Sequence, residues 1–202
     1  MNSLEQFSFD VRNDKPYALN KFTNADMAYR LCSYILDYNS DVCDVTYGYG
    51  RFIQEIRKDK KRFRMVTVGD IRVSVLINNG LNAVSFDFNR LPFKPESFDC
   101  LLYDPPYLNS GDSKLYKNKS VAHDKHVMQQ KDEEHITGHQ LMDFARVLRR
   151  NGFLVFKDVK AYYNLPHFIF YDLFIQDIGH TPVTAGVKAT KNYAFWNVFK
   201  KK

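Results

Sequence analysis

Short apolar runs that carry or lead into an aspartate recur along this chain. They are residues 42–47, 65–68, 83–86 and 100–103, with Asp44, Asp70, Asp87 and Asp104. Runs of this length, rich in Val, Leu, Phe and Cys, predict buried strands, and the segments between them are helix-like. Strands that alternate with helices favour a mostly parallel sheet, whose ligands bind at the carboxyl ends of the strands. We therefore expect the four acids to gather at one edge of the sheet.

The rest of the chain continues the alternation. Apolar residues at helical spacing predict a helix over 24–38, with Thr23 or Asn24 as its N-cap. A second helix is expected over 133–150, where Asn151-Gly152 would stop it. The other expected elements are helices at 51–58 and 165–178, a short helix or turn at 71–79, and strands at 153–156 and 193–199.

Size and composition narrow the class of protein. The 202 residues, 45% of them hydrophobic, suit one α/β domain spanning 1–202 and exclude a disordered chain. The net charge of +6 suits a polyanionic partner without requiring one. Cys32, Cys43 and Cys100 have no metal-site spacing and are interpreted as buried thiols in a reducing compartment. We see no secretory signal and no apolar run near the roughly 18 residues of a membrane helix, so we expect a soluble cytoplasmic protein without membrane contact.

A glycine loop follows the first strand. Gly48 and Gly50 would let the backbone approach a ligand closely, and the start of the next helix would supply amide donors to an anionic group. Asp70 ends the second strand, where a carboxylate can accept hydrogen bonds from the vicinal hydroxyls of a cofactor ribose. Asp87 and Phe88, after the third strand, could contact the amino edge of an adenine. The alternatives are a tight turn and solvated loop acids.

Asp104-Pro105-Pro106-Tyr107 follows the fourth strand. Two prolines remove two backbone N–H donors, which leaves the Asp104 carboxylate and the Pro105 carbonyl as acceptors. A planar amino group can give one hydrogen to each, while a base stacks on the Tyr107 ring. The arrangement suits an exocyclic amine whose lone pair points toward an electrophile. The alternative is a proline-rich strand exit with no chemistry.

Residues 108–132 are polar and form a long loop, which we expect to meet the substrate. Its Lys114, Lys117 and Lys119 are candidates to bind a phosphate backbone; a plain mobile loop is the alternative. The basic cluster at 57–64 lies at the amino edge of the sheet and is interpreted first as a solvated surface. His135 and His139 stand four apart without a third ligand, so we expect no metal site.

With these motifs in place, residues 20–160 resemble the class I S-adenosylmethionine-dependent methyltransferases, specifically the DNA amino-methyltransferases that form N6-methyladenine or N4-methylcytosine. The most specific match is Asp104-Pro-Pro-Tyr107. The resemblance implies a Rossmann-like α/β domain with a seven-stranded, mostly parallel sheet and helices on both faces. It also implies the strand order 3-2-1-4-5-7-6, with residues 193–199 in the antiparallel seventh strand.

The same resemblance implies S-adenosyl-L-methionine as cofactor and assigns the site. Catalytic roles fall to Asp104, Pro105, Pro106 and Tyr107. The implied cofactor-binding residues are Phe22, Thr23, Asp44, Thr46, Tyr47, Gly48, Gly50, Asp70, Ile71, Asp87 and Phe88. Tyr47 and Tyr49 are bulkier than the small residues common in such loops.

The favoured function is methyl transfer to adenine N6 in DNA. The same four residues also occur in enzymes that methylate adenine N6 or guanine N2 in RNA, so RNA is the main alternative. Only 1–20 and 108–132 are left to meet a substrate, so we expect low or short-range specificity, or dependence on a homodimer or a partner subunit. A catalytically silent nucleic-acid-binding subunit is a third hypothesis.

Overall fold

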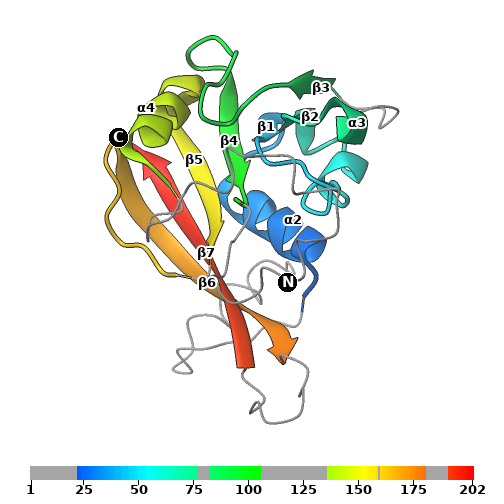
Figure 1. Cartoon of the computed structure of the whole chain (residues 1–202), viewed down its shortest axis with the longest axis vertical. Helices are drawn as coiled ribbons and strands as arrows, with labels where there is room; N and C mark the ends of the chain where they lie inside the picture. Colours follow the sequence, from blue (N-terminus) through cyan, green and yellow to red (C-terminus); the bar gives the residue numbers. More distant parts are fainter. Residues whose placement is uncertain (1–21, 77–81, 106–135, 159, 181–190) are drawn as a thin grey trace.

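A computed structural model describes residues 22–76, 82–105, 136–158, 160–180 and 191–202 (Figure 1). Its centre is a seven-stranded sheet in the order β3-β2-β1-β4-β5-β7-β6. The strands are β1 (Ser40–Asp44), β2 (Phe63–Asp70), β3 (Asn82–Ser85), β4 (Phe98–Tyr103), β5 (Leu148–Asp158), β6 (Phe168–His180) and β7 (Lys191–Lys201). Adjacent strands from β3 to β5 pair in parallel, and β7 pairs antiparallel with both β5 and β6. The expected fold class and strand order are confirmed.

The helices begin at capped residues. The helical elements are α2 (Asn24–Ile35), the 3-10 turn η1 (Ile56–Lys58), α3 (Val73–Leu76) and α4 (Gly138–Val147). Thr23 caps α2 and Thr137 caps α4, each through reciprocal bonds with the residue three positions on. These bonds satisfy amide donors that a helix start leaves without partners. The caps therefore fix where the two main helices begin.

Two apolar clusters fill the opposite faces of the sheet. On one face α2 buries Met27 and Leu31 against a cluster that includes Val42, from β1. On the other face α4 buries Phe144 against a cluster that includes Cys43, also from β1. Neighbouring residues of one strand point to opposite faces, so Val42 and Cys43 enter different clusters. Helices therefore cover both faces, as expected, and all three cysteines are buried as free thiols.

The helix expected over 165–178 is wrong. The segment forms β6, which pairs antiparallel with β7. Its aromatic and β-branched residues suit a strand, and buried Phe168 and Phe174 contrast with exposed Ile169, Tyr171 and Ile178. Pairing with β7 therefore decides the structure of this segment, where apolar residues at nearly every position carry no clear period.

Two other helix predictions need correction. Of the helix expected at 51–58, only η1 is helical, because the eight residues between Gly50 and Asp59 make a helix too short to repay the cost of nucleation. Helix α4 ends at Val147, and residues 148–150 belong to β5. Asn151-Gly152 is not the helix stop; Asn151 has φ 63° within β5, where the register with β4 shifts. Smaller differences concern the first strand, which ends at Asp44, and the first helix, which ends at Ile35.

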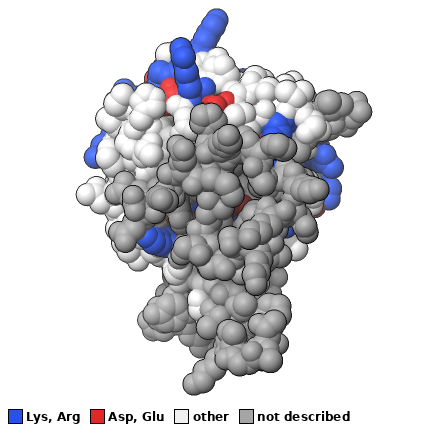
Figure 2. Space-filling view, in the orientation of Figure 1, with Lys and Arg blue, Asp and Glu red and all other residues white. Residues whose placement is uncertain are grey.

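One end of the molecule carries charged side chains of both signs. Figure 2 shows basic and acidic side chains lying together at the upper end of the molecule, toward the amino ends of the parallel strands.

Within the described ranges, no helix has the length and apolar character needed to cross a bilayer.

Candidate active site

Strand alternation brings the site residues to one face of the sheet. Asp44 pairs in register with Val68 of β2 and Leu102 of β4, and Leu102 pairs with Val155 of β5. Residues two apart on a strand share a face. The residue two positions beyond Val68, Leu102 and Val155 therefore lies on the same face of the sheet, which is the face covered by α2. Those positions are held by Asp70, Asp104 and Lys157. These three residues lie two positions nearer the carboxyl edge of the sheet than Asp44.

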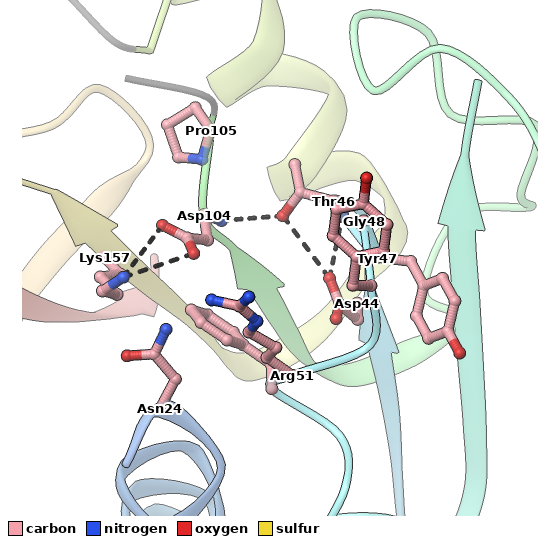
Figure 3. Close-up of a pocket in the computed structure, with 11 residues that line it drawn as sticks. Asn24, Asp44, Thr46, Tyr47, Gly48, Arg51, Asp104, Pro105 and Lys157 are labelled. Atoms are coloured by element: carbon pink, nitrogen blue, oxygen red, sulfur yellow. Dashed lines mark hydrogen bonds and ion pairs between the residues drawn. The ribbon is translucent and has the colours of Figure 1, made fainter. Parts of the chain in front are cut away.

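A cavity of about 380 Å³ opens at this edge (Figure 3). Its walls come from the start of α2, the loop after β1, the exit of β4 and the end of β5. The lining residues are Asn24, Asp44, Thr46, Tyr47, Gly48, Tyr49, Arg51, Phe52, Asp104, Pro105 and Lys157. Six of the predicted site residues therefore meet in one cavity: Asp44, Thr46, Tyr47, Gly48, Asp104 and Pro105.

A chain of hydrogen bonds joins the first and fourth strands. The Thr46 backbone N–H donates to Asp44 Oδ1 at 3.0 Å, and the Thr46 hydroxyl lies 3.5 Å from the same oxygen. The Asp104 backbone N–H in turn donates to Thr46 Oγ1 at 2.8 Å. Thr46 therefore fixes the exit of β4 against the loop after β1, with the Asp104 carboxylate directed into the cavity (Figure 3).

Asp44 lies at the base of the cavity and is 1% exposed. The pKa of its carboxyl is raised to about 7, because burial, together with the nearby Asp104 and Asp70 charges, outweighs the hydrogen bond from the Thr46 N–H. A buried carboxyl that titrates near neutrality in a cavity is typical of a functional site. A cationic ligand in the cavity would favour its ionised form.

Two residues of the glycine loop have a left-handed backbone, and the Gly50 N–H closes a tight turn on the Tyr47 carbonyl at 2.7 Å. Gly48 has φ 52° and Gly50 has φ 70°. A Cβ on Gly50 would lie 2.7 Å from the Tyr47 ring, whereas one on Gly48 would approach nothing closer than 3.7 Å. Tyr47 is thus packed beneath Gly50, while Tyr49 is 68% exposed at the rim of the cavity. The bulky loop residues leave the Gly48 backbone accessible.

Asp70 is held by the chain itself. Its carboxylate accepts the Gly48 N–H at 2.9 Å and the backbone N–H of Arg72 at 2.8 Å. The Arg72 guanidinium also bonds both carboxylate oxygens at 3.1 Å. Asp70 therefore connects the end of β2 to the glycine loop without lining the cavity itself. Ile71, the next residue, is 44% exposed.

Asp87 and Phe88 lie on the α4 side of the site. Asp87 Oδ1 accepts bonds from the Asn89 backbone and side chain at 2.8 and 2.7 Å. Buried Gln140 donates to Asn89 Oδ1 at 2.8 Å, which ties this loop to the first turn of α4. Phe88 packs edge-on against Tyr103, with ring centroids 5.6 Å apart. Neither predicted residue lines the cavity.

The start of α2 contributes one cavity residue, Asn24, that was not among the predicted site residues. The Thr23 side chain bonds Asp26 as the helix cap, and the Phe22 carbonyl accepts a 2.6 Å bond from Gln176 on β6. Asn24, the first residue of α2, lines the cavity instead. The expected N-cap at Thr23 or Asn24 placed Asn24 at the start of this helix, but it did not show that the residue lines the cavity.

Two cations in the cavity were also missed. Arg51 follows the glycine loop and lies beside the cavity, and Lys157 lies beside Asp104 (Figure 3). A search for acids at strand ends favours Asp158, yet alternation places Asp158 on the opposite face, near Tyr103, whose pKa is raised by burial and further by the Asp158 charge. The useful indication was parity: Lys157 is two residues beyond Val155, which faces α2.

Several predictions lie outside the described residues. Pro106, Tyr107, Lys114, Lys117, Lys119 and His135 belong to this group. His139 is described and is exposed on α4. Among the described side chains no group of three or more potential metal ligands was found.

Comparisons with known proteins place the fold. No protein-family model matches the chain, and no curated protein matches its sequence. Solved structures do match. A SAM-dependent methyltransferase from Methanosarcina mazei has a TM-score of 0.53 at 13% identity, covering 85% of this chain and 96% of its own. A Bacillus halodurans protein described as a methyltransferase has a TM-score of 0.58 at 13% identity, covering 87% and 99%.

TrmN from Thermus thermophilus has a TM-score of 0.55 at 16% identity, and the match covers 96% of this chain and 53% of TrmN. The chain has the Rossmann-like methyltransferase fold. At such low identities the likeness concerns the fold alone.

Proposed function

We propose that the chain is an S-adenosylmethionine-dependent N-methyltransferase whose acceptor is an exocyclic amine of a nucleic-acid base, with adenine N6 in DNA favoured. One observation carries the proposal. Asp104 and Pro105 leave β4 at the wall of the cavity, and the 2.8 Å bond to Thr46 ties them to the loop of Asp44 and Gly48. Acceptor groups for an amine thus adjoin a loop suited to a cofactor.

The cavity fits this cofactor. Its volume of about 380 Å³ is in the usual range for small-molecule sites, roughly 300–1,000 Å³. When bound, S-adenosylmethionine supplies a methyl group on a positively charged sulfur, which is an electrophile. Asp44 and Asp104 provide carboxylates that favour a cation, and Asn24 and the Gly48 backbone provide polar contacts.

Asp70 is proposed to bind the ribose hydroxyls. Both of its oxygens accept bonds from Arg72, and Oδ2 also accepts the Gly48 N–H. Contact with a ribose therefore requires the Arg72 guanidinium to turn away from at least one oxygen. We propose that Asp87 and Phe88, adjoining Tyr103, approach the adenine.

The acceptor amine is proposed to bind at the exit of β4. The Asp104 carboxylate and the Pro105 carbonyl each accept one N–H, which directs the nitrogen lone pair toward the methyl carbon. As the lone pair forms the new N–C bond, the C–S electron pair stays with sulfur and the nitrogen becomes positive. Both acceptors then bind the amine more strongly, so they stabilise the transition state over the ground state. The surplus proton leaves from nitrogen afterwards.

A base inside a duplex cannot reach this cavity, so the substrate must be single-stranded or flipped. We propose that Tyr107 stacks on the base and that Lys114, Lys117 and Lys119 bind phosphates. The net charge of +6 supports a polyanionic substrate. A homodimer or a partner subunit stays a prediction.

The test uses the full chain, methyl-labelled cofactor and separate pools of DNA and RNA, followed by nucleoside analysis. Labelled N6-methyladenine in DNA supports the proposal. Label found only in RNA would favour the alternative, in which RNA is the substrate. Label in neither pool would reject a nucleic acid as the methyl acceptor. If the cofactor also fails to raise the melting temperature of the chain, the result favours the hypothesis of a catalytically silent subunit.

A further inference from the structure

Lys157 lies within the cavity wall as a nearly buried cation. Its side chain is 9% exposed, and its Nζ lies 3.4 Å from Asp104 Oδ2 and 3.5 Å from Oδ1. The residue is near the end of β5, two positions beyond Val155, whose side chain is in the α2-side core. Because an ammonium loses hydration on burial, its position needs a compensating charge, which Asp104 provides.

Aromatic rings confine the lysine. Nζ lies 5.6 Å from the Phe52 ring centroid and 5.9 Å from that of Trp196, within reach of cation–π attraction. The two rings stack at 4.8 Å with an interplanar angle of 28°, and the Trp196 indole N–H donates to buried Gln176 at 2.9 Å. The Lys157 ammonium therefore lies against two stacked aromatic rings.

Other charges face Asp104 as well. Asp44 of β1 lies close enough for the two carboxyl charges to interact, and Arg51 lines the cavity from the loop after β1. Arg51 is exposed, whereas Lys157 is held by packed rings. Of these two cations, Lys157 has the fixed position and the direct contact with the carboxylate (Figure 3).

We propose that Lys157 is a positioning residue for the methyl-transfer site, which holds the Asp104 carboxylate ionised and turned toward the acceptor amine. An ionised carboxylate can only accept hydrogen bonds, so it favours a methyl acceptor whose reacting group carries a hydrogen-bond donor, as an amine does. Lys157 itself does not touch the reacting nitrogen. This inference rests on the proposed function and deepens it, because it assigns the control of Asp104 to a residue on a different strand.

The test compares the wild type with Lys157→Met, Lys157→Arg and the control Lys200→Met in the labelled-cofactor assay. Lys200 also lies over an aromatic ring, that of Phe153 at 5.9 Å, but it belongs to the far end of β7. For Lys157→Met we expect kcat to fall by about 10- to 100-fold, as small misplacements of catalytic groups do, with little change in cofactor Kd. Lys157→Arg should restore part of kcat, and Lys200→Met should match the wild type.

The pH profile gives a readout that a merely structural role would not move. Without the ammonium, Asp104 is protonated at a higher pH, so the acid limb of kcat/KM should shift upward in Lys157→Met and stay in place in Lys157→Arg. An active Lys157→Met enzyme with wild-type kcat and an unmoved acid limb would overturn the inference while leaving the proposed function intact.

A second measurement is independent of turnover. Urea unfolding of the wild type, Asp104→Asn, Lys157→Met and the double variant gives the coupling between the two side chains. We expect the effects on the unfolding equilibrium constant to deviate from additivity by more than about twofold. A smaller coupling would overturn the inference even if no nucleic acid were methylated, whereas inactivity with a strong coupling would reject only the proposed function.

Discussion

The two edges of the central sheet use the same kinds of residue for different purposes. At the amino edge, the second residues of four neighbouring strands are Arg64, Asp41, Asp99 and Arg149. At the carboxyl edge, the same strands end near Asp70, Asp44, Asp104 and Lys157. Asp41 and Asp44 belong to one five-residue strand, yet their surroundings differ.

Asp41 is buried but fully paired. Arg64 binds both of its oxygens, and Arg149 contacts Oδ2 at 2.7 Å while also binding Asp99 at 2.6 Å. Burial alone would raise the pKa of Asp41, but hydrogen bonds from the two arginines outweigh it and hold the pKa below its usual value. Asp44 accepts hydrogen bonds from Thr46 and has a raised pKa. An acid paired with arginines thus stabilises the fold, whereas an acid that lines a cavity is available to a ligand.

The largest expected effect comes from the carboxyl edge. Asp104→Ala removes an acceptor that strengthens in the transition state, so methyl transfer should fall by about 100-fold or more. The labelled-cofactor assay measures this loss, and calorimetry with the cofactor should show nearly unchanged binding. Asp99→Ala serves as the matched control at the opposite edge, where activity per folded molecule should be kept. Equal activity in Asp104→Ala and the wild type would reject the assignment.

The next effect should appear in stability alone. Asp41→Asn leaves the Arg64 and Arg149 guanidinium groups without their carboxylate, which should cost about 1–3 kcal/mol in the free energy of unfolding at pH 7. Chemical denaturation measures the cost. Cofactor binding of the folded variant should stay at the wild-type value. A variant that keeps full stability but loses cofactor binding would contradict the assignment of stability to the amino edge and of ligand binding to the carboxyl edge.

The two acids should also give opposite pH dependences. The folded-state pKa of Asp41 is depressed, so its contribution to stability is present above its ordinary value of 3.8 and is lost as pH falls through the lower folded value. The pKa of Asp44 is raised from 3.8 to about 7, so the folded state holds a proton that the unfolded state releases, and stability falls as pH rises between these values. Asp44→Asn should remove this decline, as measured by unfolding at several pH values. An unchanged slope would show that Asp44 ionises normally.

The smallest expected effects separate the two loop glycines. Gly50→Ala places a methyl against the Tyr47 ring in a left-handed backbone, so it should destabilise the chain by more than about 1 kcal/mol and weaken cofactor binding. Gly48→Ala has the same backbone penalty without the collision and should cost about 1 kcal/mol. Thermal unfolding with and without cofactor distinguishes them. Identical losses would mean that the Tyr47 packing does not shape the loop.

The sequence predicted the parts of the molecule that follow from local pattern. Strand ends marked by acids located β1, β2 and β4, and the resemblance supplied the strand order, including an antiparallel β7. The pattern failed at β6, where apolar residues at nearly every position carry no clear period and pairing with β7 decides the structure. It also failed at 51–58, where packing of buried Phe52 and Ile53 replaces a regular helix.

For the candidate site, the sequence identified the acids but not their partners. Asp44 and Asp104 line the cavity as expected, yet the Arg72 contact with Asp70 depends on how a short turn folds back. Lys157 was missed because its neighbour Asp158 has the more conspicuous chemistry. Which of two adjacent polar residues enters a site depends on strand parity, and that is known only once the register is known.

The order of the strands also bears on synthesis of the chain. The last strand in sequence, β7, lies between β5 and β6, so β6 has no neighbour in this sheet until β7 has been made. On the ribosome, a nascent chain that has reached residue 180 has no partner strand for the backbone of β6. The Ile169 and Tyr171 side chains of β6 are exposed even in the folded chain. Completion of the sheet therefore waits for translation of residues 191–201, and until then this stretch is open to chaperones or to faulty association.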